Sequence, residues 1–142
     1  MNHTSHLQGA LQQYKKIGAH TDVATASPHR LIQMLLEGAL EKINLAKGYM
    51  QRGEIQLKGN HISWAISIID GLRISLDQEA GGDIAANLDA LYDYMGRRLA
   101  EANLTNDVAM LDEVSRLLLE IKAAWDQVPG VLNDQADGAP GE

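Results

Sequence analysis

The chain has 142 residues, enough for one domain, and a formal net charge of −7, which disfavours nucleic acid or an anionic membrane surface as its main partner. It has no cysteine, which excludes disulfides and thiol chemistry, and no run of about 18 apolar residues that could be inserted into a membrane. Hydrophobic residues make up 45% of the chain and aromatic residues only 4%, a balance that favours packed helices over sheets. The first residues show no basic region followed by an apolar run, so we expect a cytoplasmic protein without a signal peptide.

Residues 1–27 precede the first strong helical signal. Leu11, Tyr14 and Ile17 suggest a short helix, and residues 18–25 have the composition of a linker. We expect this segment to form a flap. Ser27 and Pro28 then mark the start of a helix, because a serine hydroxyl can accept from unpaired amides and proline suits the first helical position.

Four segments show apolar residues at gaps of three and four, the spacing of one helical face. The first two helices are expected over residues 28–51 and about 54–78, the second ending at a tight connection over residues 79–82. Asp83 is the expected start of the third helix, which ends near residue 104. A short turn over residues 103–107 follows, with Asn106 or Thr105 as the cap, and the last helix covers about 107–127. The third stripe consists of Ile84, Leu88, Leu91, Tyr92, Met95, Leu99 and Ala102.

Long helices joined by short turns predict an all-α fold, an antiparallel up-down four-helix bundle with a short N-terminal helix or flap. Residues 1–132 are expected to form this single domain. Residues 133–142 contain glycine, proline and acidic residues without an apolar pattern, and we expect a disordered acidic tail.

Helical bundles can hold di-iron sites built from Glu and Glu-x-x-His pairs. None of the five histidines has a glutamate three residues before it, and the core stripes contain no glutamate. No motif places a nucleophile beside a base. We therefore expect no catalytic residues, no metal and no cofactor. A bundle enzyme or metal carrier is the least favoured class.

Apolar side chains outside the core stripes are the more informative feature. Trp64 and Ile68 lie off the main stripe of their helix, and Tyr94 is turned about 200° from Tyr92. Two interpretations stay open at this point. Either the N-terminal helix and long side chains cover this surplus surface, or the surface forms a groove for a partner helix.

The chain also resembles the flagellar secretion chaperone FliS family from about Leu11 to Trp125. The resemblance is carried by a long ordered set of residues, not by one short motif. It comprises Tyr14, Val23, Thr25-Ala26-Ser27-Pro28, Leu31-Ile32-Gln33-Met34-Leu35, Gly38-Ala39, Ile68-Ile69-Asp70, Ser75-Leu76-Asp77-Gln78-Glu79, Gly81-Gly82-Asp83-Ile84-Ala85, Asn87-Leu88, Leu91-Tyr92-Asp93-Tyr94-Met95, Arg98-Leu99, Ala102-Asn103 and Ala124-Trp125. One departure is Leu36-Glu37, where many relatives have an aromatic residue followed by Asp.

The resemblance implies an antiparallel bundle without enzymatic activity that binds the C-terminal region of flagellin, prevents its premature polymerisation and delivers it to the flagellar type III export gate. In the family, the segment around the residue matching Tyr14 lies over a hydrophobic groove. Leu11, Tyr14 and Val23 are therefore the first candidate contacts. Further candidates are Leu40, Ile43, Trp64, Ile68, Leu91 and Tyr94.

We expect a monomer or weak homodimer. The alternative function is that of an adaptor or anti-regulator binding another amphipathic helix of a flagellar protein.

Overall fold

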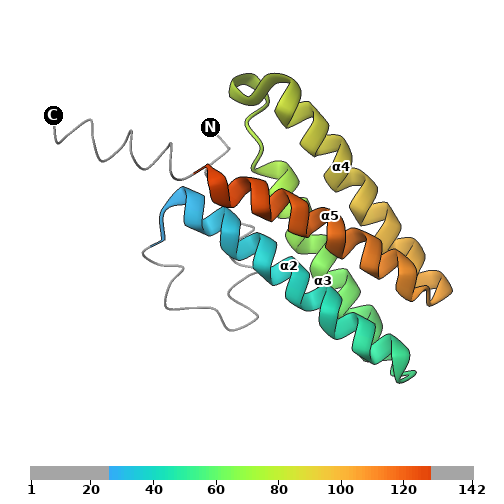
Figure 1. Ribbon diagram of the computed structural model, residues 1–142. Helices are drawn as coiled ribbons and strands as arrows, with labels where there is room; N and C mark the ends of the chain where they lie inside the picture. Colours follow the sequence, from blue (N-terminus) through green and yellow to red (C-terminus); the bar gives the residue numbers. More distant parts are fainter. Residues whose placement is uncertain (1–25, 129–142) are drawn as a thin grey trace, which may run out of the picture.

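The computed structural model describes residues 26–128, which form four helices: α2 (Pro28–Gln51), α3 (Ile55–Ile74), α4 (Gln78–Thr105) and α5 (Val108–Gln127). Successive helices run in opposite directions, and Figure 1 shows them as an up-down bundle. Helices α2 and α4 each pack against both α3 and α5, which closes a ring around one core. The predicted all-α four-helix bundle is confirmed.

The N-terminal helix expected near Leu11 and the tail over residues 133–142 lie outside the described residues. The same holds for the candidate contacts Leu11, Tyr14 and Val23, and for His3 and His6. Within residues 26–128 no helix is both long and apolar enough to cross a membrane, and no cluster of acidic and histidine side chains could hold a metal ion.

The predicted apolar stripes supply the core. Leu35, Leu36 and Ala39 of α2 are fully buried, as are Met95 and Leu99 of α4. Helix α3 buries residues over a wider arc than predicted, because it contacts α2 on one side and α4 on the other. Its sealed apolar residues are Ile62, Ala65, Ile68, Ile69 and Leu72.

The connection between α3 and α4 differs from the prediction. Helix α3 ends at Ile74, and the chain turns at residues 75–77 instead of 79–82. Helix α4 begins at Gln78 because the Asp77 carboxylate accepts from the amide of Ala80, at 3.1 Å, and caps the new helix. The predicted break before Asp83 is present as a non-helical conformation at Gly82, but a short helical turn capped by Asp77 precedes it, which the prediction missed.

Gly81 and Gly82 serve two different purposes inside α4. A Cβ at Gly81 would lie 2.7 Å from the Cβ of Ala85, closer than side chains approach, so only glycine fits there. Gly82 has φ 51° and ψ −127°, a conformation that interrupts the helical geometry and that L-residues with a side chain rarely adopt. The first turn of α4 is thus set off from the remaining helix, as Figure 1 shows at the top of α4.

At the opposite end of α4, a buried lysine joins two helices. Lys58 of α3 donates to the backbone carbonyl of Asn103, at 2.9 Å, and to Oδ1 of Asn106, at 2.6 Å. Asn106 adopts a left-handed conformation and caps the C-terminus of α4, whereas Asp107 caps α5 by accepting from Ala109. Asn106 or Thr105 was the predicted cap of this turn. Asn106 is a cap, at the C-terminus of α4, whereas the N-terminus of α5 is capped by Asp107.

Candidate binding groove

A large apolar cavity lies at the end of the bundle where α2 begins and α5 ends. Its volume is about 910 Å³. The walls come from the first turns of α2, the last turns of α3 and α5, and the first half of α4. Its apolar lining side chains are Pro28, Ile32, Leu36, Leu72, Leu76, Ala80, Ile84, Ala85, Leu88, Ile121, Ala124, Trp125 and Val128. We call this cavity the α2–α5 groove.

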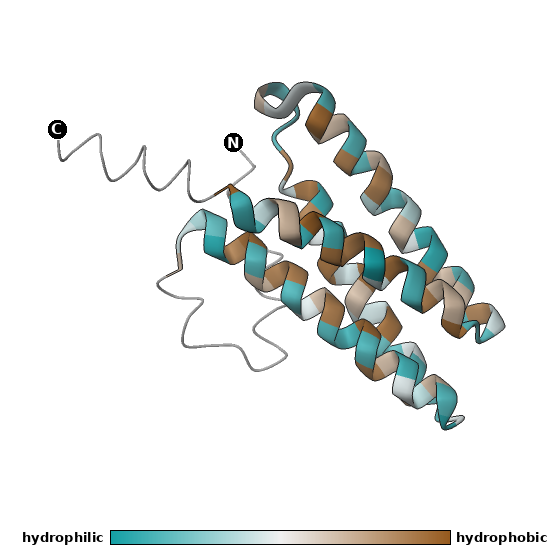
Figure 2. Ribbon diagram, viewed as in Figure 1, coloured by the Kyte–Doolittle hydropathy of each residue, from teal (hydrophilic) through white to brown (hydrophobic). Residues whose placement is uncertain are grey.

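The start of α4 and the end of α5 both line the groove. Helix α4 has 28 residues, but Gly82 interrupts its helical geometry, so its continuous part begins after that residue. Figure 1 shows the upper end of α4 standing apart from α5, and Figure 2 shows hydrophobic residues recurring along this upper part. Ile84, which lines the groove, is 72% exposed.

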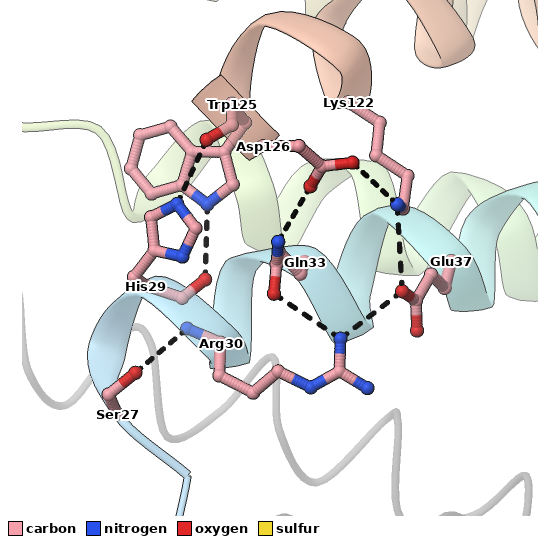
Figure 3. A network of polar contacts seen from close by, with 8 residues as sticks. All are labelled: Ser27, His29, Arg30, Gln33, Glu37, Lys122, Trp125 and Asp126. Carbon is pink, nitrogen blue, oxygen red and sulfur yellow. Dashed lines mark hydrogen bonds and ion pairs between the residues drawn. The ribbon is translucent and has the colours of Figure 1, made fainter. Parts of the chain in front are cut away.

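One wall of the groove is held by a paired contact between α2 and α5. His29 Nε2 lies 2.9 Å from the backbone oxygen of Trp125, and Trp125 Nε1 donates to the backbone oxygen of His29 at 3.0 Å. The two rings stack, with centroids 4.7 Å apart and planes 9° from parallel. Figure 3 shows this reciprocal arrangement. It fixes Trp125, a large part of the apolar wall, against the start of α2.

A polar network continues from this pair along the outside of the same two helices (Figure 3). Asp126 accepts from Gln33 at 2.6 Å and from Lys122 at 2.9 Å. Lys122 also lies 3.7 Å from Glu37, which pairs with Arg30 at 3.2 Å. The hydrogen bonds from Lys122 and then Gln33 hold the pKa of Asp126 below its ordinary value. The charged groups thus tie α2 to α5 outside the groove.

The groove's interior carries few polar groups. Ser75 Oγ donates to the backbone oxygen of Leu72 at 2.8 Å, and Asp77 caps α4. Tyr92 is 4% exposed, and this burial raises the pKa of its hydroxyl to about 12. The hydroxyl therefore stays protonated at neutral pH. Such an apolar surface suits the apolar face of an amphipathic helix.

Six of the sequence-predicted contacts fall within the described residues, and the structure places them outside the lining of the α2–α5 groove. Ile43 and Ile68 are sealed in the core, at 1% and 0% exposure, because α2 and α3 pack directly over them. Neither has surface to offer a partner in this packing. Leu40, Leu91, Trp64 and Tyr94 are partly buried, and none of these four lines the α2–α5 groove.

Trp64 and Tyr94 occupy two different faces. Trp64 lies under the ammonium group of Lys42, 4.4 Å from its ring centroid, and beside His61. The Tyr94 hydroxyl donates to Glu113 at 2.6 Å across the α4–α5 interface. Both side chains thus have structural contacts within the bundle.

The groove residues themselves were assigned from the sequence to core stripes. Ile84 and Leu88 have the periodicity of buried residues, and so do Ile121 and Trp125. Periodicity indicates which face of a helix is apolar. It does not indicate whether another helix covers that face at a given residue. No local signal in the sequence distinguishes these residues from those of the core.

Comparison with known proteins identifies the family. The model of a family described as "Flagellar protein FliS" matches residues 10–131. The chain belongs to the FliS family.

Several curated members of the FliS family are similar over most of their length. The chain is 52% identical over 119 residues to flagellar secretion chaperone FliSB of Pseudomonas aeruginosa, covering 84% of this chain and 94% of the relative. It is 47% identical over 123 residues to flagellar secretion chaperone FliS of Vibrio cholerae, covering 87% of this chain and 90% of the relative. Flagellar secretion chaperone FliS of Salmonella typhimurium is 46% identical over 119 residues, covering 83% of this chain and 88% of the relative.

FliS is a family of chaperones and not of enzymes, so the expected class is confirmed as a flagellar export chaperone. The Leu36-Glu37 pair, where we expected a departure from the family pattern, lies beside the groove. Leu36 is fully buried and lines the groove floor, whereas Glu37 contributes to the network between α2 and α5.

Proposed function

We propose that this protein binds the C-terminal segment of flagellin in the cytoplasm, keeps it from polymerising prematurely and delivers it to the flagellar type III export gate. The observation that supports this most is the α2–α5 groove. It is an open apolar surface on a member of a family named for flagellar secretion.

The groove offers what a polymerising segment needs to bury. An amphipathic terminus that assembles through its apolar face associates prematurely when that face is exposed to water. Side chains such as Ile84, Leu88 and Ile121 supply a substitute surface. Burial of apolar area stabilises the complex by about 25 cal/mol per Å², and the ordering of the client offsets part of this. Binding is then firm and still reversible.

The contacts predicted from the sequence within residues 26–128 do not line the groove, and we propose other roles for the predicted contacts. Leu11, Tyr14 and Val23 lie outside the described residues, and on the family resemblance we propose that their segment shields the groove when no client is bound. Leu40 and Leu91 remain candidates for contacts of a client that extends beyond the groove. Trp64 and Tyr94 are instead assigned to contacts within the bundle, which their pairing with Lys42 and Glu113 supports. The protein is proposed to act as a monomer or weak homodimer.

The test is calorimetric titration of the full chain with a synthetic flagellin C-terminal peptide. We expect heat of binding with a negative heat-capacity change, and a rise in Tm with peptide concentration. A peptide with its apolar face replaced by serine is the control and should show neither. Absence of both heat and Tm shift for the unaltered peptide, measured at two temperatures, would refute flagellin binding.

The alternative role and the delivery step have separate tests. Amphipathic segments of other flagellar proteins, titrated in the same way, should bind more weakly than the flagellin peptide. Tighter binding by one of them would favour the adaptor or anti-regulator role. The soluble part of the export gate should retain the chaperone–flagellin complex on a column, and failure to do so contradicts delivery.

A further inference from the structure

Among the polar side chains that line the groove, Tyr92 differs from the others in its hydrogen bonding. Ser75 and Asp77 are engaged with backbone groups of their own turns, and His29 is held by Trp125. Glu120 is exposed to solvent at the rim. Tyr92 is the exception, because its side chain is buried and its hydroxyl makes no hydrogen bond within residues 26–128.

The position of the Tyr92 hydroxyl follows from accessibility. Among the described residues, every side-chain oxygen or nitrogen that is sealed from solvent has a hydrogen-bond partner. The Tyr92 hydroxyl oxygen has no partner among these residues, so it is not sealed and must reach accessible space. The residue as a whole is nevertheless only 4% exposed. The accessible space that Tyr92 lines is the α2–α5 groove.

We propose that Tyr92 is a specificity-determining residue of the groove, whose hydroxyl donates a hydrogen bond to a neutral acceptor oxygen on the apolar face of the bound segment. This inference rests on the proposed function. In a helical client, backbone carbonyls are engaged except in the last turn. The acceptor is therefore inferred to be an amide or hydroxyl side chain that faces the groove.

The expected selectivity follows from the cost of burying an unpaired donor. A wholly apolar segment would cover the Tyr92 hydroxyl without giving it a partner, and such a loss typically weakens binding by about tenfold. A segment with a well-placed acceptor avoids that loss. The groove would thus distinguish its client from other amphipathic helices of equal hydrophobicity.

Tyr94 provides a matched control on the same helix. Its hydroxyl donates to Glu113 at 2.6 Å, and it does not line the groove. Tyr92→Phe and Tyr94→Phe each remove one oxygen without changing the volume of the ring. We expect Tyr92→Phe to weaken binding of the flagellin peptide about tenfold with an unchanged or higher Tm. Tyr94→Phe should lower the Tm and leave affinity unchanged.

A second measurement pairs the hydroxyl with its acceptor. Each polar side chain of the peptide is replaced in turn by an apolar residue of similar size. One replacement should weaken binding to the unaltered chain about tenfold and have no further effect on Tyr92→Phe. Equal affinity of the two proteins for the unaltered peptide would overturn the inference while leaving flagellin binding intact. A fall in Tm with Tyr92→Phe equal to that with Tyr94→Phe would also overturn it, whereas a peptide that does not bind the unaltered chain refutes the proposed function itself.

Discussion

The two halves of α4 carry the same apolar stripe and have opposite surroundings. In the second half, Met95, Leu99 and Ala102 are fully buried between α3 and α5. In the first half, Leu88 is only partly buried, and Ile84 is mostly exposed beside the groove. One sequence pattern thus builds a closed core at one end and an open apolar surface at the other.

The difference teaches that amphipathicity sets which face of a helix is apolar, while the placement of its neighbours sets whether that face is covered. In the first half of α4, Ala85 is buried, whereas Ile84 is exposed beside the groove. Under the proposed function, the exposed apolar residues of the first half bind the client, and the buried residues of the second half stabilise the fold. The following predictions test this division.

The largest expected effect is on stability in the closed half. Leu99→Ala leaves a cavity in a fully buried site and should lower the free energy of unfolding by about 2–5 kcal/mol. Leu88→Ala, in the open half, should cost clearly less. Urea denaturation of the two variants measures both values. Equal losses would show that Leu88 is as firmly packed as Leu99.

The next effect concerns binding and uses two exposed residues of α4. Ile84→Asp puts a charge into the apolar wall of the groove and should weaken binding of the flagellin peptide by ten- to a hundredfold, roughly the value of burying one isoleucine. Leu104→Asp is the control, because Leu104 is 83% exposed and lies at the opposite end of the helix. Calorimetry measures both affinities. An equal loss with Leu104→Asp would place the client elsewhere.

A smaller effect is expected from the wall formed by Trp125. Trp125→Phe removes the hydrogen bond to His29 and should lower the free energy of unfolding by about 0.5–1.5 kcal/mol. It should also weaken peptide binding several-fold. Trp64→Phe is the matched control on a face away from the groove, and it should leave affinity unchanged.

Fluorescence of the Trp64→Phe variant reports on Trp125 alone, since the chain has two tryptophans. Binding of the peptide should change this emission. Emission from Trp125 that stays constant at saturating peptide would contradict a client in the groove.

The smallest effect is a response to acid. Hydrogen bonds from Tyr94 and then Arg98 lower the pKa of Glu113, and those from Lys122 and Gln33 lower that of Asp126. A carboxylate whose pKa is lower in the folded state than in the unfolded state stabilises the fold at pH values above its unfolded-state pKa. This contribution is lost as the pH falls through the folded-state pKa.

Stability should therefore decline below about pH 4.5 for Glu113 and below about pH 3.8 for Asp126. Glu113→Gln and Asp126→Asn should each remove part of the decline in the unfolding free energy. The Glu113 change acts between α4 and α5, and the Asp126 change acts between α2 and α5. An unaltered acid profile in both variants would contradict these pKa shifts.

Most of the fold could be predicted from the sequence, because buried stripes and start signals are local. The Ser27-Pro28 start of α2 and the stripe from Leu35 to Ala46 appear as expected. The α3–α4 connection was misplaced, since two adjacent glycines suggest a turn more strongly than a single aspartate suggests a cap. The structure shows Gly81 within a helical turn and Gly82 at its end.

The site was less accessible to sequence reasoning. Residues off the main stripe were expected to form the client surface, yet Ile68 is fully buried, since α3 packs against two neighbours. The residues that do line the groove have the pattern of a core. Whether they are covered depends on where the helices end in space, and periodicity contains no information on that point.

The backbone of Gly82 has one more implication. Its dihedral angles of 51° and −127° are the mirror image of −51° and 127°, an ordinary extended conformation for an L-residue. A D-alanine introduced there by chemical synthesis would consequently have a relaxed backbone, whereas L-alanine would be strained even though its Cβ would meet no atom within 4 Å. The bend at the start of α4 thus depends on handedness, and a single D-residue in place of Gly82 would favour its geometry.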